Sequence, residues 1–118
     1  MAGLTTHVLD TTHGRPASGL ALRLFDREAG PAGPPLVESR TNADGRLDAP
    51  LIAATDMRKG RFRLEFDVAD YFRALGVELP DPPFLDSVVI DFAIAEPEGH
   101  YHVPLLVSPF GYSTYRGS

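Results

Sequence analysis

The chain has 118 residues, of which 43% are hydrophobic and 23% charged, and its formal net charge is -5 at pH 7. This size and composition are typical of one globular domain with a single core, so we expect one domain over residues 1–118. The absence of cysteine excludes disulfide frameworks, thiolate metal sites and cysteine nucleophiles. An acidic chain without a cluster of basic residues also argues against a nucleic-acid partner.

Most of the chain alternates hydrophobic and polar residues, and this period of two predicts strands. Eleven Gly and eleven Pro add turns between them. The predicted strands cover residues 5–10, 20–25, 36–41, 61–66, 88–94, 100–107 and 112–116, and a further strand begins at 46–48. About eight short strands predict an all-β sandwich.

One segment departs from this pattern. Asp67 is suited to cap the start of a helix and Gly76 to end it. Between them, apolar residues fall at positions i, i+3, i+4 and i+7, which predicts one short helix: Val68, Tyr71, Phe72 and Leu75.

The predicted strand 100–107 has two different faces. One face carries Tyr101, Val103, Leu105 and Val107 and is expected to join the core. The other carries His100, His102, Pro104 and Leu106, whereas a solvated face would more often show Lys, Glu or Thr. We infer that the histidine face lines a semi-polar pocket and meets another subunit. The alternative is an edge strand whose histidines lie in water.

His7 lies in the first predicted strand, on the face shared by Thr5 and Leu9. A single strand histidine is most often a surface or core residue, and His7 gains interest because a second histidine-bearing strand exists. Arg46 follows the turn at residues 42–45. His13 lies in a turn, and we expect it to be solvent-exposed without a functional role.

The residues also bear on two other chemistries, a zinc site and a serine hydrolase. His7, His100 and His102 are the residue types of a three-histidine zinc site, but no clear carboxylate supports them. A serine hydrolase is disfavoured because the chain has no Gly-x-Ser-x-Gly motif. We therefore expect neither a metal nor a cofactor. The start of the chain has no basic segment followed by an apolar run, and no stretch is long enough to span a membrane, so we expect a cytoplasmic protein without a membrane partner.

The segment Tyr115-Arg116-Gly117-Ser118 carries an aromatic ring, a guanidinium and a hydroxyl beside a free carboxylate. Together with residues 4–10 and 100–106, it resembles the transthyretin-related proteins, whose enzymatic branch is the 5-hydroxyisourate hydrolases. The resemblance covers nearly the whole chain. It implies a transthyretin-like sandwich of two four-stranded sheets with one short helix, assembled as a homotetramer with sites at subunit interfaces.

The resemblance also implies an activity. It places catalytic roles on His7, Arg46, His102 and Ser118, and substrate binding on Tyr115, Arg116, Gly117 and, at a neighbouring motif position, His100. The implied reaction opens the six-membered ring of 5-hydroxyisourate, giving 2-oxo-4-hydroxy-4-carboxy-5-ureidoimidazoline in urate degradation. One histidine would activate water and the other would protonate the leaving nitrogen, and the sequence does not say which is which.

Two other function classes remain open at this point. A transthyretin-like carrier would bind a small molecule without catalysis, and an interaction module would bind another protein. Transthyretins proper replace the histidines and continue past the tail with a different sequence. The paired histidines and the complete tail therefore favour the hydrolase.

Overall fold

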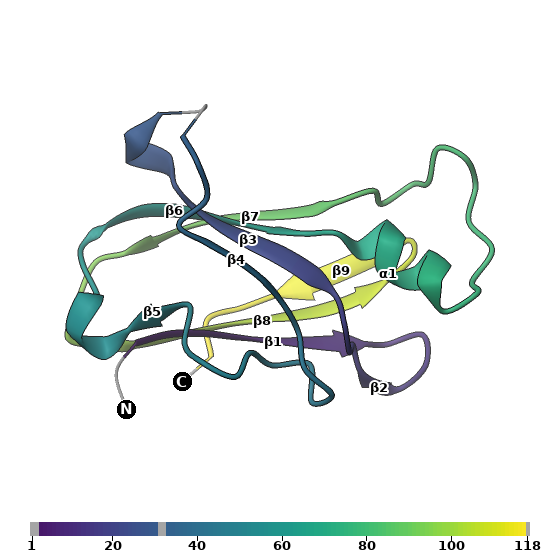
Figure 1. Ribbon diagram of the computed structural model, residues 1–118, viewed down its shortest axis with the longest axis horizontal. Coiled ribbons are helices and arrows are strands. Elements are labelled where there is room, and N and C mark those ends of the chain that lie inside the picture. Colours follow the sequence, from purple (N-terminus) through teal and green to yellow (C-terminus); the bar gives the residue numbers. More distant parts are fainter. Residues whose placement is uncertain (1–2, 31–32, 118) are drawn as a thin grey trace.

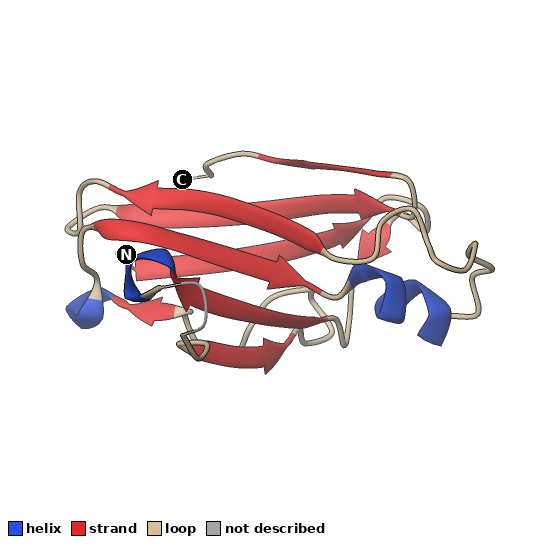
Figure 2. Ribbon diagram, turned by 90° about the horizontal axis from the view of Figure 1, so that it is seen from above, coloured by secondary structure: helices blue, strands red, loops and turns tan. Residues whose placement is uncertain are grey.

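The computed structural model describes residues 3–30 and 33–117, which form two sheets packed face to face (Figures 1 and 2). The first sheet has the order β2-β1-β8-β9, and β5 also pairs with β1. The second has the order β4-β3-β6-β7. The first sheet contains β1 (Gly3–Asp10), β2 (Arg15–Pro16), β5 (Ile52–Ala53), β8 (His100–Ser108) and β9 (Gly111–Thr114). The second contains β3 (Ala21–Asp26), β4 (Val37–Arg40), β6 (Gly60–Phe66) and β7 (Val88–Ile94).

The pairing of β1 with β8 joins segments far apart in the sequence. It is parallel, with Thr5 opposite His102 and His7 opposite Pro104, whereas the other strand pairs are antiparallel. Neighbouring residues in a ladder present their side chains on the same side of the sheet. The register therefore brings the polar face of β1 beside the histidine face of β8.

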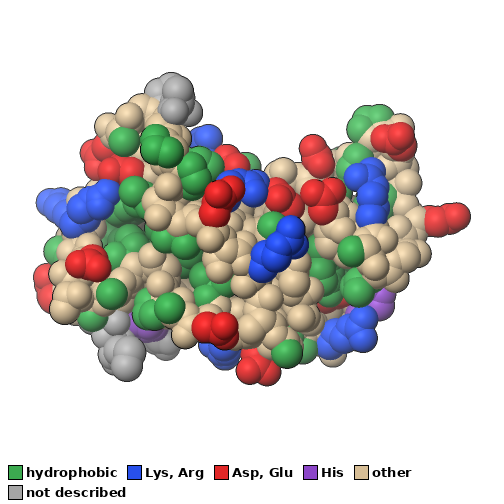
Figure 3. Space-filling model, in the orientation of Figure 1, with side chains coloured by type: hydrophobic (Ala, Val, Ile, Leu, Met, Phe, Trp, Pro, Cys, Tyr) green, Lys and Arg blue, Asp and Glu red, His purple; other side chains and the backbone are tan. Residues whose placement is uncertain are grey.

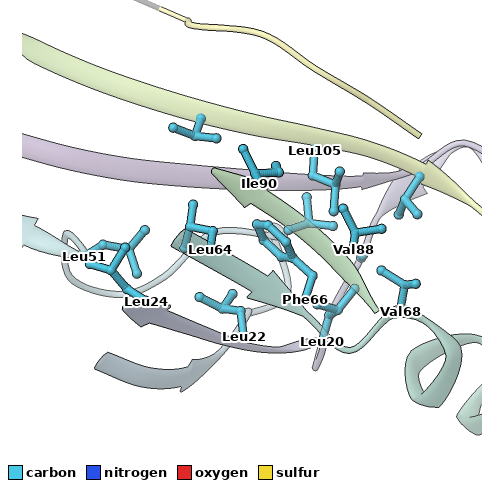
Figure 4. Close-up of a cluster of buried hydrophobic side chains, with 14 of the residues drawn as sticks. Leu20, Leu22, Leu24, Leu51, Leu64, Phe66, Val68, Val88, Ile90 and Leu105 are labelled. Carbon is cyan, nitrogen blue, oxygen red and sulfur yellow. The ribbon is translucent and has the colours of Figure 1, made fainter. Parts of the chain in front are cut away.

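The core lies between the two sheets and explains why their strands alternate. Leu22 and Leu24 of β3, Leu64 and Phe66 of β6 and Leu105 of β8 are at most 1% exposed (Figure 4). Burying a side chain of this size contributes roughly 1.5–3 kcal/mol. The predicted core face of β8 is confirmed, since Tyr101 and Val103 are 6% exposed and Val107 is fully buried.

The predicted helix is α1 (Val68–Ala74), and two single 3-10 turns, η1 (Arg27–Ala29) and η2 (Ala54–Asp56), accompany it. Asp67 occupies the N-cap position but makes no capping hydrogen bond with its side chain. Its carboxylate instead accepts two hydrogen bonds from Arg23 of β3, at 3.1 and 2.7 Å. No described helix is long and apolar enough to cross a membrane.

Two details differ from the sequence-based expectation. The predicted strand starting at 46–48 is irregular, and the short β5 pairs with Gly3 and Leu4 instead. The two-residue β2 also pairs with β1, so the first sheet has five strands rather than four. The last strand ends at Thr114, two residues earlier than predicted. The short strand β5 and the end of β9 depend on backbone pairing with distant segments, and the alternation of hydrophobic and polar residues does not encode that pairing.

A buried carboxylate joins β1 to α1. Asp10 is 1% exposed and accepts hydrogen bonds from the Tyr71 hydroxyl, at 2.8 Å, and from Nδ1 of His13, at 2.6 Å. Burial opposes its ionisation, but these bonds outweigh that effect and lower the pKa of Asp10. Burial, with the bond to Asp10, raises the pKa of Tyr71 to about 12. His13 is exposed, as predicted, and stabilises the end of β1.

Candidate active site

A hollow of about 430 Å³ opens beside β1 and β8, at the end of the sheet where β8 begins. Its walls are formed by β1, by β8 and by the irregular segment 46–50, where the sequence predicted the beginning of a strand. Its lining residues are Thr5 and Thr6 of β1, residues 46–50, and His100 and His102 of β8.

The two histidines of β8 lie one above the other along the strand. Their rings are nearly parallel, with 10° between the planes and 6.4 Å between the centroids. Nδ1 of His102 lies 2.8 Å from Oγ1 of Thr5, while Nδ1 of His100 is buried without a hydrogen-bond partner in the described part of the chain. Burial, followed by the nearby Arg46, His100 and His7, lowers the pKa of His102 from its ordinary value. These surroundings favour the neutral ring, which is able to accept a proton.

The turn at 42–48 holds Arg46 at the rim of the hollow. The Asn42 side-chain oxygen accepts hydrogen bonds from the backbone N–H groups of Asp44, at 2.9 Å, and Arg46, at 3.2 Å. The N–H of Val8 donates to the Gly45 carbonyl at 2.8 Å, which ties the turn to β1. Gly45 has φ +74°, and a Cβ there would collide with the Val8 carbonyl oxygen. Only glycine allows this approach, so the turn and β1 form one unit.

His7 lies on the same face of β1 as Thr5 and is fixed by that turn. Its Nε2 is 2.9 Å from the Asp44 carbonyl oxygen. A carbonyl only accepts, so Nε2 carries a proton. His7 does not line the hollow itself, but it is close enough to influence the pKa of His102.

The tail returns along β8 beyond the end of β9. The N–H of Gly117 donates to the His102 carbonyl at 2.7 Å. A Cβ on Gly117 would lie 2.7 Å from Cδ2 of the His102 ring, so this position has no room for a side chain. Gly117 is thus held against the imidazole that borders the hollow.

Arg116 and Tyr115 lie elsewhere. The Arg116 guanidinium stacks on the Tyr101 ring, 4.0 Å from its centroid, and donates to the His100 carbonyl at 3.3 Å. Both residues line a second hollow of about 240 Å³ that also includes Ile90, Phe92 and Val103. Within this one chain, they are not brought into the histidine hollow. Ser118 lies outside the described residues.

A three-histidine zinc site requires three ligands close enough to coordinate one ion. Within residues 3–30 and 33–117, no group of three His, Cys, Asp or Glu side chains is arranged to hold a metal ion. His7 is engaged with the Asp44 carbonyl rather than aligned with the β8 pair.

Sequence reasoning missed several residues of the hollow. Thr5 lies two residues before His7 and therefore on the same face of β1, and this spacing could have indicated Thr5 as a residue of the site. Asp48 and the residues next to it were assigned to a strand, whereas Asp48 accepts a 3.0 Å hydrogen bond from the Asn42 amide and lines the hollow. No sequence signal identified that irregular segment as a wall of the site.

Comparison with known proteins agrees with this architecture. The HIUase/Transthyretin family pattern matches residues 4–117. The chain is 55% identical to a 5-hydroxyisourate hydrolase of Caulobacter vibrioides, with full coverage of both chains. It is 44% identical to one of Mus musculus, covering 98% of this chain and 94% of the relative.

Solved structures agree as well. A 5-hydroxyisourate hydrolase of Klebsiella pneumoniae superposes with a TM-score of 0.81 at 36% identity, covering all of both chains. An (S)-allantoin synthase gives a TM-score of 0.91 at 39% identity, covering 99% of this chain, which spans 44% of that longer protein. The predicted transthyretin-like fold is confirmed, and the chain belongs to the HIUase/Transthyretin family.

Proposed function

We propose that this protein is a 5-hydroxyisourate hydrolase that opens the six-membered ring of its substrate with water and acts in urate degradation. The observation that carries the proposal is the meeting of His102, His100 and Arg46 around one hollow in a chain whose full-length relatives bear that name. The product would be 2-oxo-4-hydroxy-4-carboxy-5-ureidoimidazoline.

The hollow suits this substrate class. A volume of about 430 Å³ is in the range of small-molecule sites, and an oxidised purine is small and anionic. Arg46 supplies a guanidinium, which binds planar anions through parallel hydrogen bonds. The side chain of Arg46 is exposed, so it is free to turn toward a bound anion.

His102 is the proposed general base. Its lowered pKa leaves the ring unprotonated at neutral pH. The oxygen of a water molecule attacks the ring carbonyl carbon, while the water proton passes to His102. Arg46 stabilises the resulting oxyanion, the carbon–nitrogen bond breaks, and the leaving nitrogen takes a proton. A positioned base of this kind typically contributes about 10²–10⁴-fold in rate.

His7 is the proposed donor of that proton. Its Nε2–H group already donates to the Asp44 carbonyl, so His7 is oriented by the same turn that carries Arg46. To donate this proton, the Nε2–H of His7 would exchange the Asp44 carbonyl for the leaving nitrogen. This assignment gives the neutral His102 the base role and His7 the acid role.

The tail is proposed to complete the site. Gly117 contacts the His102 backbone and leaves no space beside the ring, which limits how the imidazole can rotate. Ser118 is proposed to hold the attacking water. Tyr115 and Arg116 are proposed to bind substrate in the assembled protein, where a neighbouring subunit meets the tail.

We further propose a homotetramer whose sites lie between subunits. On the outer face of β1 and β8, Leu9 and Leu106 lie beside the histidines without a charged residue of β1 or β8 among them. Two such faces related by a two-fold axis would enclose the open hollow. Light scattering should report four chains per particle, whereas a fully active monomer would contradict this arrangement.

A cytoplasmic location is also proposed. A chain without cysteine folds without an oxidising compartment. Fractionation of cells producing the full chain would test it, and recovery of the protein outside the cytoplasm would contradict it.

The deciding experiment is a hydrolysis assay with 5-hydroxyisourate generated freshly from urate by urate oxidase. Added protein should accelerate the decay of its absorbance. His102→Ala and deletion of residues 115–118 should each reduce kcat by roughly 100-fold or more. His13→Ala is the matched control, because His13 is bound to Asp10 and not to the hollow. Saturable binding without faster decay would instead identify a carrier.

A further inference from the structure

We propose that Thr5 is a positioning residue whose hydroxyl accepts the Nδ1–H of His102 and thereby leaves Nε2 as the base. This direction of the hydrogen bond rests on the base role proposed for His102. The bond and the state of the ring are nevertheless measurable in the resting protein, without turnover.

The strand pairing places the two groups side by side. Thr5 and His102 are register partners in the parallel β1–β8 pair, and their side chains share the outer face of the sheet. Oγ1 of Thr5 and Nδ1 of His102 are 2.8 Å apart, which is a short hydrogen bond. Threonine is β-branched, and its hydroxyl therefore has few rotamers to sample. The bond is thus built into the sheet register.

The direction of this bond decides whether His102 is a base. A hydroxyl either donates or accepts, and a neutral imidazole carries its proton on one nitrogen only. If Thr5 donated to Nδ1, the proton would be on Nε2 and the ring would have no free lone pair. If Thr5 accepts from Nδ1–H, Nε2 keeps its lone pair and can take a proton from water. Only the second arrangement fits a neutral His102 that activates water.

The direction also decides what the hydroxyl hydrogen of Thr5 does. No other described residue accepts it, and Thr5 lines the hollow. When Thr5 accepts from His102, this hydrogen is left for water or for a substrate oxygen. The neighbouring Thr6 differs, because its hydroxyl is buried and donates to the Val103 carbonyl at 2.7 Å.

Burial and the neighbours of His102 do not perform this selection. Burial, followed by Arg46 in the 42–48 turn, His100 on β8 and His7 on β1, disfavours a second proton on the ring. These effects bear on whether His102 is charged. Thr5 is the side chain that contacts Nδ1, so it sets which nitrogen carries the single remaining proton.

The first test measures the ring directly. Nitrogen-15 NMR of the full-length protein at a pH at which His102 is neutral should show Nδ1 protonated and Nε2 unprotonated, with the signals assigned by comparison with His102→Asn. Thr5→Val keeps the branched shape and removes the hydroxyl. It should move the ring toward the Nε2–H form, whereas Thr5→Ser should retain the wild-type form.

The second test measures turnover. Thr5→Val should lower kcat for 5-hydroxyisourate by roughly tenfold or more and change KM little, because misplacing a catalytic group costs up to about 10²-fold. Thr5→Ser should recover most of the rate. Thr11→Val is the matched control, since it removes a hydroxyl that bonds the Val107 carbonyl at 3.1 Å, away from the hollow.

The outcomes separate the two proposals. The role of Thr5 would be overturned, whatever the activity, by either of two results. One is a wild-type His102 protonated on Nε2, and the other is a Thr5→Val variant in which the protonated nitrogen of His102 is the same as in the wild type. Wild-type protein that has the expected ring but does not hydrolyse 5-hydroxyisourate would refute the proposed function alone. Equal loss of kcat in Thr5→Val and Thr11→Val would reduce Thr5 to a structural residue.

Discussion

The two outer faces of the sandwich satisfy their polar groups in different ways. On the face of β3, β6 and β7, charges pair within the chain: Arg23 binds Asp67 at 2.7 Å and Arg63 binds Asp91 at 2.7 Å. Figure 3 shows acidic and basic side chains interspersed over the side of the molecule seen there. On the face of β1 and β8, histidines and leucines lie together, and Nδ1 of His100 lacks a partner among the described residues.

This difference separates a surface built for water from one built for a ligand or another subunit. Charges that pair with neighbours in the same chain already have their partners. A buried nitrogen without a partner costs free energy unless another molecule supplies one. The β1–β8 face is the one on which we propose the subunit contact, and the following substitutions test the contrast.

The largest effect is expected from a charge placed on the histidine face. Leu106 is half-buried beside the histidines, and Leu106→Lys would force an unpaired ammonium into the proposed subunit contact. Burying such a charge costs roughly 3 kcal/mol or more, equivalent to about 100-fold in association. Light scattering and the hydrolysis assay should show dissociation and loss of activity.

Val89→Lys is the matched change on the other face. Val89 is 41% exposed and pairs in register with Glu65, so the added ammonium would meet solvent and a carboxylate. Assembly and activity should stay as in the wild type. If both lysine variants behave alike, the contrast between the faces has no functional meaning.

An intermediate effect is expected at the tail. Gly117→Ala would place a methyl group 2.7 Å from the His102 ring, and the ring or the tail would have to move. Misplacing a catalytic group by about 1 Å costs up to 10²-fold, so we expect kcat to fall at least tenfold, as measured by steady-state kinetics. Gly111→Ala is the control, because its nearest neighbour would be 4.0 Å away. Unchanged turnover in Gly117→Ala would remove the tail from the mechanism.

The smallest effect is expected on the charged face. Arg23→Gln removes the paired hydrogen bonds to Asp67 and the 3.7 Å contact with Glu65. A partly exposed ion pair contributes about 0.2–1 kcal/mol, so urea denaturation should show a loss of that size with kcat unchanged. A large fall in activity would mean that the charged face also serves the site.

Much of the fold follows from local pattern. Alternation indicated the long strands and the buried face of β8, and helical spacing indicated α1, because each depends on which side of an element meets the core. Asp67 shows the limit of such reasoning: its position at the helix start was predicted, but its carboxylate binds Arg23 of a strand 44 residues away.

The site was predictable only in part. His102, His100 and Arg46 were expected together and do line one hollow, whereas Thr5 and Asp48 were missed. The parallel register of β1 and β8 places Thr5 against His102, and residues 97 apart carry no local sign of that pairing. The second hollow at Arg116 and Tyr115 likewise depends on how the tail crosses Tyr101.

The parallel contact between β1 and β8 also bears on how the protein comes into being. Contacts between residues so distant along a polypeptide close large loops and slow folding. During synthesis, β1 leaves the ribosome long before β8 and lacks this neighbour until β8 has been made. A chain stalled before residue 100 would have Thr5 and Arg46 but lack His100 and His102, so the hollow that these residues line together could not yet form.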